Sequence, residues 1–288
     1  MEPDLRKKVL LTGTNGFLGG YLASELVKYN IDLIKTTRQK VPDSNVCNLE
    51  SRDEVSTLIN KFSPDLVVHC AAFVPKTAKE YGNNILSFRN QTMLQNILDA
   101  TKAPIIYISS MTVYGSSKNV IRHESDSGLP ESSYGASKYE GELLLKKDGR
   151  DSLSIRIPGL FGQGRNNGLV VNTIRSLSNN KKPHLPESEI LWASMDVEDA
   201  AKIIAELSVK INLNGYTPIN VGYSGVYSIN RFLSICEGIF KKTIEYELNH
   251  PEFEFDLTLL KRFNVAPSNN LKIALIKLKD KYELNSNK

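Results

Sequence analysis

A glycine-rich segment directly after an apolar run limits most tightly how this chain can fold. Residues 8–11 are Lys-Val-Leu-Leu, residues 12–19 are Thr-Gly-Thr-Asn-Gly-Phe-Leu-Gly, and Leu18, Leu22 and Leu26 then recur at helical spacing. A strand, a glycine turn and a helix in this order are typical of a cradle for the phosphates of a dinucleotide. The glycines let the backbone approach a pyrophosphate, and the helix N-terminus offers it free N–H groups. A tight turn without a ligand is the alternative interpretation.

Short apolar runs alternate with helical stretches along the rest of the chain. The strand-like runs cover residues 9–12, 32–36, 66–70, 105–110, 154–158 and 219–222. This alternation predicts an α/β fold, in which helices cover both faces of a parallel sheet. Ligands of such sheets bind at the carboxyl ends of the strands. The Gly-, Ser- and Asn-rich loops 115–119 and 162–168 are therefore candidate lids or substrate contacts.

Three polar side chains supply the groups that a carbonyl–alcohol redox site needs. Tyr134 and Lys138 are four residues apart, so they share one face of a helix, and Ser110 ends a predicted strand. The ordinary pKa of tyrosine is about 10, and a lysine cation close by lowers it toward the range in which a phenol exchanges protons at neutral pH. Ser110 would hold the substrate oxygen while a hydride moves.

Composition excludes several classes of function. The chain has 288 residues and a formal net charge of +4, and residues 6–8 form its longest basic block, so nothing here argues for nucleic-acid binding. The three cysteines lie far apart without metal-ligand spacing, so we expect reduced thiols and no metal site. The first residues carry no apolar signal core, and no run approaches the length of a membrane span. We therefore expect a cytoplasmic protein that does not bind membranes.

The order of these motifs resembles that of the extended short-chain dehydrogenases/reductases of the nucleotide-sugar epimerase, dehydratase and reductase type. The resemblance runs from about residue 8 to residue 283. Besides the motifs above it includes residues 65–72 (Asp-Leu-Val-Val-His-Cys-Ala-Ala), Asn90, residues 156–162 (Arg-Ile-Pro-Gly-Leu-Phe-Gly) and residues 196–200 (Asp-Val-Glu-Asp-Ala). It implies a Rossmann-type doubly wound parallel sheet with a small C-terminal substrate-binding region.

The resemblance also implies a division of the chain and a set of site residues. Residues 1–160 would form the NAD(P)-binding core, to which 191–224 would return, while 161–190 and 225–288 would form the substrate-binding region. Ser110, Tyr134 and Lys138 would be catalytic. Besides Tyr134 and Lys138, the cofactor would contact Gly13, Asn15, Gly16, Phe17, Leu18, Gly19, Arg38, Asn45, Val46, Ala71, Ala72, Phe73 and Pro158. The substrate would contact Thr112, Gly159, Arg165 and Trp192.

The end of the second predicted strand bears on the choice of cofactor. NAD-binding members of the family usually carry an aspartate there, which holds the ribose hydroxyls, whereas this chain has Thr37 followed by Arg38. Loss of the acid removes repulsion toward a 2′-phosphate, which an arginine can hold with two parallel hydrogen bonds. We therefore expect NADP(H) to be favoured over NAD(H). Alternatively, Arg38 stacks on the adenine, as arginine can with either cofactor.

Three departures from the family pattern bear on the reaction. Dehydratases carry an Asp-Glu pair after the catalytic hydroxyl, and Met111 and Thr112 stand there instead, which disfavours a dehydratase. Gly159 replaces a family asparagine and Trp192 a family arginine, both near the substrate phosphates. These two losses weaken the argument for a nucleotide sugar. Arg165 could compensate for them, as could the lysines at 181–182, although these charges could equally be solvated surface groups.

The leading prediction is an NADPH-dependent reductase of a nucleotide-linked keto-sugar of the 4-keto-6-deoxyhexose type. Epimerases of the family return the hydride to the substrate and keep NAD bound, so an NADPH preference favours net reduction. A nucleotide-sugar epimerase, a carbonyl reductase of a non-nucleotide small molecule and a cofactor-sensing regulatory subunit remain as alternatives. The resemblance further implies a homodimer, in which the helices at 84–101 and 134–147 of two subunits form a four-helix bundle.

Overall fold

A parallel sheet of seven strands forms the centre of the computed structural model, which describes residues 6–75, 80, 82–115, 119–210, 212 and 214–286. From edge to edge the strands are β10 (Tyr216–Asn220), β7 (Ser152–Ile157), β5 (Ile105–Ser110), β4 (Leu66–His69), β1 (Lys7–Thr12), β2 (Ile31–Thr37) and β3 (Asn45–Val46). Every neighbouring pair runs parallel. The predicted α/β fold of the Rossmann type is confirmed, with β3 as a short strand that the sequence pattern did not predict.

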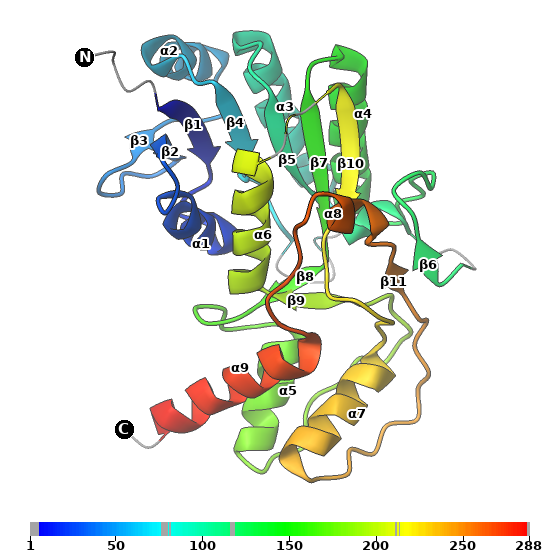
Figure 1. Ribbon diagram of the computed structural model, residues 1–288. Coiled ribbons are helices and arrows are strands. Elements are labelled where there is room, and N and C mark those ends of the chain that lie inside the picture. The colour runs from blue at the N-terminus through cyan, green and yellow to red at the C-terminus, as the bar shows by residue number, and fades with distance from the viewer. Residues whose placement is uncertain are drawn as a thin grey trace.

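Helices cover both faces of the sheet because successive strand residues point to opposite faces. Val9 and Leu11 pack in one apolar cluster with residues of α1 (Phe17–Leu26) and α6 (Val197–Lys210). Leu10, between them, packs in a second cluster with α2 (Arg52–Phe62), α3 (Asn84–Ala100) and α4 (Ser133–Asp148). In Figure 1, α1 and α6 lie in front of the sheet, and α3 and α4 lie behind it.

The chain reverses its direction across the sheet at β1. Strands β2 and β3 follow on one side of β1, and β4 then continues on the other side. In open parallel sheets, ligands bind beyond the carboxyl ends of the strands at such a reversal. Thr12 at the end of β1 pairs with His69 at the end of β4. The glycine-rich segment and residues 70–73 therefore leave the sheet side by side.

The remaining elements are short strand pairs and further helices. Two separate two-stranded sheets are formed by β6 (Ile121–Arg122) with β11 (Glu254–Phe255) and by β8 (Gly159–Phe161) with β9 (Ser194–Asp196). The helices are α5 (Leu169–Ser178), α7 (Ile229–Phe240), α8 (Thr258–Arg262) and α9 (Leu271–Ser286). In Figure 1 the arrowheads of the large sheet point down toward α5, α7 and α9. The division of the chain near residue 160 stays a prediction; segment 191–224 holds β9, α6 and β10, and β10 is an edge strand of the large sheet.

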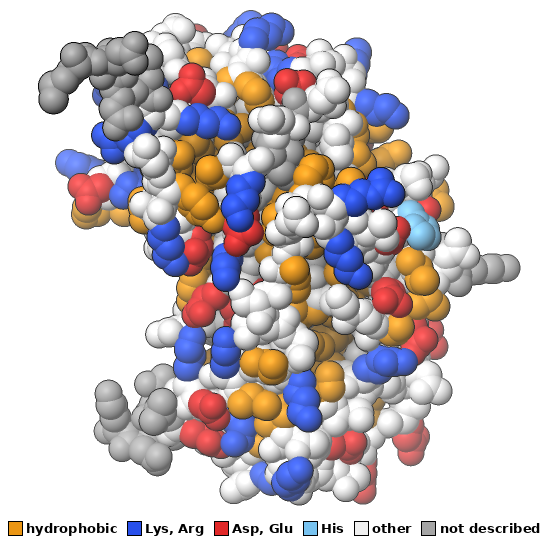
Figure 2. All heavy atoms as spheres, viewed as in Figure 1, with side chains coloured by type: hydrophobic (Ala, Val, Ile, Leu, Met, Phe, Trp, Pro, Cys, Tyr) orange, Lys and Arg blue, Asp and Glu red, His pale blue; other side chains and the backbone are white. Residues whose placement is uncertain are grey.

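The surface gives no sign of a strongly charged binding face in the view of Figure 2, where acidic and basic side chains are intermingled over most of the molecule. In the described part of the chain, no helix combines the length and the apolar character that crossing a bilayer needs. Of the predicted loop 115–119, residues 116–118 lie outside the described residues.

Candidate active site

The glycine-rich segment leaves no room for side chains at two of its positions. Gly13 has a positive φ of 73°, and a Cβ atom there would lie 2.7 Å from the Cα of Ala71. A Cβ on Gly19 would lie 2.0 Å from the carbonyl oxygen of Gly13. Helix α1 follows with Gly16 as its N-cap, and no side chain caps its first turn. Backbone that can be approached closely and a helix N-terminus that no side chain occupies fit a dinucleotide pyrophosphate.

Thr12 joins the ends of β1 and β4 beneath this segment. Its Oγ1 accepts hydrogen bonds from the backbone N–H groups of Cys70 and Ala71, both at 3.1 Å, and lies 3.0 Å from Nδ1 of His69. Because Oγ1 already accepts two bonds, its own proton goes to the imidazole, whose Nδ1 must be an acceptor. Burial lowers the pKa of His69 to about 3, with a further contribution from the Lys138 cation, so the ring is neutral. The sequence analysis did not identify Thr12 as a site residue.

Ser110 ends β5, and its hydroxyl is held from one side by Thr112. Ser110 Oγ accepts from the backbone N–H of Thr112 at 3.2 Å and from Thr112 Oγ1 at 3.0 Å. The strand ends at Ser110 and does not continue through Thr112. Residues Met111–Val113 form a 3₁₀ turn because the Ser110 side chain caps it. With two bonds accepted, the proton of Ser110 is left to donate to a substrate oxygen.

Tyr134 and Lys138 stand one turn apart near the start of α4, where the side chain of Ser132 caps the helix. Lys138 is buried, its Nζ donates to the carbonyl oxygen of Ile108 at 2.8 Å, and the same atom lies 5.9 Å from the centroid of the Tyr134 ring. Burial lowers the pKa of Lys138 to about 8. The amine therefore still carries its proton in most molecules at neutral pH, as lowering the pKa of a neighbouring phenol requires.

Asn90, on α3, connects the segment after β4 to α3 and α4, the two helices behind the sheet. Its Oδ1 accepts from the Phe73 N–H at 2.7 Å, and its Nδ2 donates to the Phe73 carbonyl oxygen at 3.2 Å and to Ser137 Oγ at 3.5 Å. The segment after β4, which holds the predicted contacts Ala71, Ala72 and Phe73, is therefore fixed against α3 and α4.

Arg38 lies at the end of β2 against an aromatic side chain. Its Cζ is 5.3 Å from the ring centroid of Phe73, and the Cζ of Arg89 is 3.7 Å from the same centroid. Arg89 donates two hydrogen bonds, at 2.8 and 2.7 Å, to the carboxylate of Glu50, and this pairing holds the pKa of Glu50 below its ordinary value. Thr37 ends β2 as predicted. Arg89 and Glu50 were not predicted, because no local pattern links residues so far apart in sequence.

The predicted contacts Asn45 and Val46 form the edge strand β3. Asn45 Nδ2 donates to the carbonyl oxygen of Lys35 at 3.2 Å, so this side chain supports β2. Val46 pairs with Thr37 and is exposed. The predicted contact Pro158 directly follows β7, at the carboxyl end of that strand.

Three of the four predicted substrate residues line one cavity. A cavity of about 110 Å³ lies between the loop after β8, the start of α5 and the approach to β9, and Gly159, Arg165 and Trp192 line it together with the α5 N-cap, Gly168. The ring of Trp192 packs 5.1 Å from that of Phe232, so it serves both the cavity wall and the core. The fourth predicted residue, Thr112, is not part of this lining but contacts Ser110.

The loop that carries Arg165 rests on the glycine-rich segment and the helix that follows it. The Cζ of Arg165 is 5.5 Å from the ring centroid of Phe17 in the glycine-rich segment. Tyr21 in α1 donates a hydrogen bond of 2.9 Å to the carbonyl oxygen of Gln163. The candidate substrate loop and the candidate phosphate cradle are therefore in direct contact. Among the described residues, no group of three or more His, Cys, Asp or Glu side chains could hold a metal ion.

Comparisons with known proteins assign the chain to one family. The family described as the RmlD substrate binding domain matches residues 7–210. A "Methionine adenosyltransferase 2 subunit beta" of Danio rerio is 29% identical over 159 residues, which are 54% of this chain and 49% of that protein, so the match spans about half of the relative. A "dTDP-4-dehydro-6-deoxyglucose reductase" of Escherichia coli is 26% identical over 275 residues, covering 85% of this chain and 84% of that protein.

Solved structures share the whole fold. The UDP-glucose 4-epimerase of Thermotoga maritima, solved with UDP-glucose, has a TM-score of 0.81 and covers 98% of this chain and 100% of its own. Its sequence identity of 18% shows the fold alone.

Proposed function

Because the chain belongs to the RmlD substrate-binding-domain family of extended short-chain dehydrogenases/reductases, we propose that it is an NADPH-dependent reductase of a nucleotide-linked keto-sugar of the 4-keto-6-deoxyhexose type. The observation that carries this proposal is the placement of Ser110, Tyr134 and Lys138 beyond the carboxyl end of β5, two strands away from the glycine cradle at the end of β1. The similarity to a dTDP-4-dehydro-6-deoxyglucose reductase over 85% of the chain supports the substrate class.

The roles of the three side chains follow from their contacts. NADPH, held by the glycine cradle and Arg38, would supply the hydride. Ser110 accepts two hydrogen bonds and therefore donates its hydroxyl proton to the carbonyl oxygen of the substrate. This hydrogen bond holds the carbonyl group in place. Tyr134 gives its phenolic proton to that oxygen as negative charge develops there, which makes it the general acid. Lys138 keeps its charge at neutral pH and favours ionisation of the phenol.

Two features support NADPH over NADH. Thr37 and Arg38, rather than a carboxylate, stand at the end of β2. The nearby carboxylate of Glu50 is paired with Arg89, so little of its charge is left to oppose a 2′-phosphate beside Arg38. A guanidinium group at this position suits a phosphate, since its planar donors can form two parallel hydrogen bonds.

The cavity beside α5 supports a substrate that carries phosphate. Its lining includes Arg165 and the first residues of α5, a helix whose N-terminus has no side-chain cap. A helix N-terminus and an arginine together favour an anion. Trp192 offers an aromatic face to the same cavity, which suits a base or a sugar ring.

The test is the oxidation of NADPH by the purified full chain, followed by nicotinamide absorbance, with a nucleotide-linked 4-keto-6-deoxyhexose as substrate. We expect turnover with NADPH, slower turnover with NADH, and an alcohol at the former keto position. Tyr134→Phe is the matched control: it is expected to abolish turnover while leaving the affinity for NADPH unchanged, because the ring remains and only the proton donor is lost. Full activity of this variant would contradict the assignment of the general acid.

A second candidate is favoured by one comparison, the similarity to a methionine adenosyltransferase subunit. In that case the chain would bind cofactor as part of an assembly without reducing a substrate. Cofactor binding with no turnover on any keto-sugar nucleotide would support it. Tightly bound NAD(H) that copurifies, with interconversion of two sugar nucleotides and no net oxidation, would instead identify an epimerase.

A further inference from the structure

Helix α4 carries a third polar residue in line with its two candidate catalytic residues. Tyr134, Lys138 and Glu142 follow one another at intervals of four, so they share one face of the helix. The Glu142 side chain is only 1% exposed. A buried carboxylate is costly unless it is fully paired, and none of the roles described above uses it.

Glu142 ties α4 to three strands of the large sheet. Its Oε1 accepts from Ser109 Oγ of β5 at 2.5 Å and from Arg156 Nε of β7 at 3.1 Å. Its Oε2 accepts from Arg156 Nη2 at 2.7 Å and from the hydroxyl of Tyr216 in β10 at 3.2 Å. The carboxylate therefore accepts four hydrogen bonds, two of them from a guanidinium that is itself buried.

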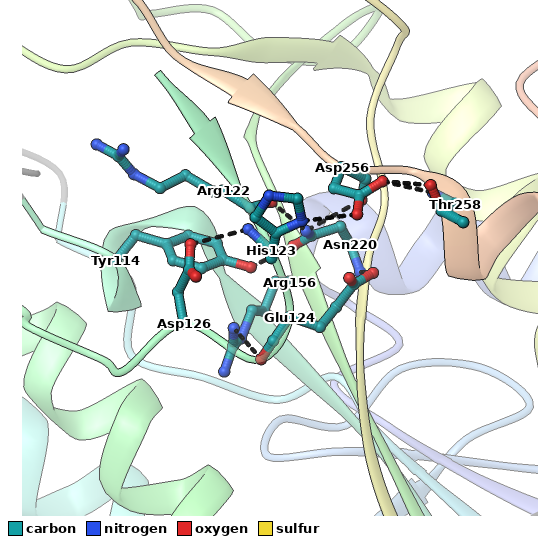
Figure 3. A network of polar contacts seen from close by, with 9 residues as sticks. All are labelled: Tyr114, Arg122, His123, Glu124, Asp126, Arg156, Asn220, Asp256 and Thr258. Atoms are coloured by element: carbon teal, nitrogen blue, oxygen red, sulfur yellow. Dashed lines mark hydrogen bonds and ion pairs between the residues drawn. The ribbon is translucent and has the colours of Figure 1, made fainter. Parts of the chain in front are cut away.

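The same network extends from Arg156 to the β6–β11 pair, as Figure 3 shows. Arg156 Nη1 donates to the Glu124 carbonyl oxygen at 3.2 Å, and its Cζ lies 4.8 Å from the Tyr114 ring centroid. The Tyr114 hydroxyl donates to Asn220 Oδ1 at 2.7 Å, and Asn220 Nδ2 donates to the carbonyl oxygen of Arg122 in β6 at 3.0 Å. The catalytic helix and the β6–β11 pair are therefore linked through one buried ion pair.

The charge of Glu142 also acts on Lys138. The titratable groups that face Lys138 come from β4, the residue after it, β5 and α4, and they are His69, Cys70, Tyr107, Tyr134 and Glu142. Burial lowers the pKa of His69 to about 3, raises that of Cys70 to about 12 and raises that of Tyr107 well above its ordinary value, so all three are neutral near pH 7. Within this set, Glu142 supplies the carboxylate, and its negative charge opposes loss of the lysine proton.

From this arrangement, and resting on the proposed function, we propose that Glu142 is a positioning residue that acts through Lys138. Its hydrogen bonds fix the catalytic helix on the sheet, and its negative charge helps Lys138 to keep its proton. Two variants separate these effects. Glu142→Gln keeps the size of the side chain and removes the charge, whereas Glu142→Asp keeps the charge and shortens the side chain.

The test compares the pH profile of kcat/KM and the pH dependence of NADPH affinity in both variants and the unmodified chain. In the unmodified chain, both quantities should fall as the pH rises past the pKa of Lys138, about 8. In Glu142→Gln this alkaline fall should move to lower pH by about one pH unit, because an opposite charge near the amine is gone. In Glu142→Asp the fall should stay where it is, even though kcat drops. An unmoved fall in Glu142→Gln, or the same displacement in both variants, would overturn the proposal.

Glu142→Gln could fail to fold, since that change leaves Arg156 buried without its counter-ion. A further variant tests the proposal in that case. Glu142→Gln together with Arg156→Gln leaves no unpaired buried charge, and we expect the alkaline fall to move in the same direction in this double variant. The affinity measurement needs no turnover. If the chain binds NADPH but reduces no substrate, the proposed reductase function fails, while the affinity profile still decides the role of Glu142.

Discussion

On the proposed function, Arg38 is the residue expected to select NADPH over NADH. Arg38→Ala should weaken NADPH binding about tenfold, the loss expected for one charge-assisted hydrogen bond to a phosphate. NADH binding should remain nearly unchanged, because NADH has no 2′-phosphate. Fluorescence titration of both cofactors measures the two affinities. Lys40→Ala is the matched control, since Lys40 is an exposed cation two residues further along.

The two interpretations of Arg38 give different results in this experiment. An equal loss for NADPH and NADH would mean that the guanidinium stacks on the adenine and does not select the 2′-phosphate. The contact of Arg38 with the Phe73 ring keeps the guanidinium beside the segment that follows β4 in either case.

At the scale of single residues, the sequence predicts side chains that act through a local spacing. The four-residue interval between Tyr134 and Lys138 on a helix and the placement of Ser110 at a strand end are both found in the structure. Thr12 and Glu50 were not predicted, because their partners are distant in sequence and leave no periodic signal. Glu142 could have been found, since it continues the interval of four on α4.

At the scale of elements, α3 and α4 pack side by side and carry the predicted dimer face. Phe88 on α3 is 68% exposed, and Ile85 and Leu143 are also exposed large apolar residues on these helices. If the chain forms the expected four-helix bundle, burying these side chains stabilises it. Phe88→Glu should then shift gel filtration of the chain from dimer to monomer at micromolar concentration.

The control for this prediction is Val27→Glu, because Val27 is 62% exposed at the C-terminal end of α1 and far from α3 in sequence. That variant should elute like the unmodified chain. A monomer before any substitution would contradict the predicted dimer.

Elements with a long apolar pattern were predicted, and very short ones were not. The six predicted strands correspond to β1, β2, β4, β5, β7 and β10, each with at least four residues, although β10 begins at Tyr216 and ends at Asn220, earlier than the predicted run 219–222. The strands β3, β6 and β11 have two residues each, which is too short for the period-two pattern to be seen. The 3₁₀ turn after β5 was not predicted, because it depends on a cap by the Ser110 hydroxyl and the spacing of apolar residues carries no sign of such a cap.

At the scale of the whole molecule, buried titratable groups make stability depend on pH. The pKa of His69 falls from an ordinary 6.5 to about 3 in the folded chain, because burial opposes the imidazolium. The unfolded chain therefore takes up a proton that the folded chain refuses, and the free energy of unfolding should fall as the pH drops from 6.5 toward 3. Urea denaturation over this range should show the loss.

His69→Asn should reduce this loss, since it removes the titrating ring. Asp196 works in the opposite direction, because burial raises its pKa from 3.8 to about 6 and the folded carboxyl holds its proton more tightly. The stability contributed by Asp196 should grow as the pH falls through this interval. If the free energy of unfolding fell equally steeply with decreasing pH in the unmodified chain and in His69→Asn, another group would be responsible for the loss of stability in acid.

The contact between Arg165 and Phe17, together with the bond from Tyr21 to Gln163, has a consequence for the order of events in one turnover. The loop beside the candidate substrate cavity rests on Phe17 of the glycine-rich segment and on Tyr21 of α1. On the proposed function, binding of the cofactor to the glycine-rich segment would set the position of the loop before the substrate binds. These contacts favour an ordered mechanism in which the cofactor would bind before the sugar substrate. The oxidised nucleotide would then leave last.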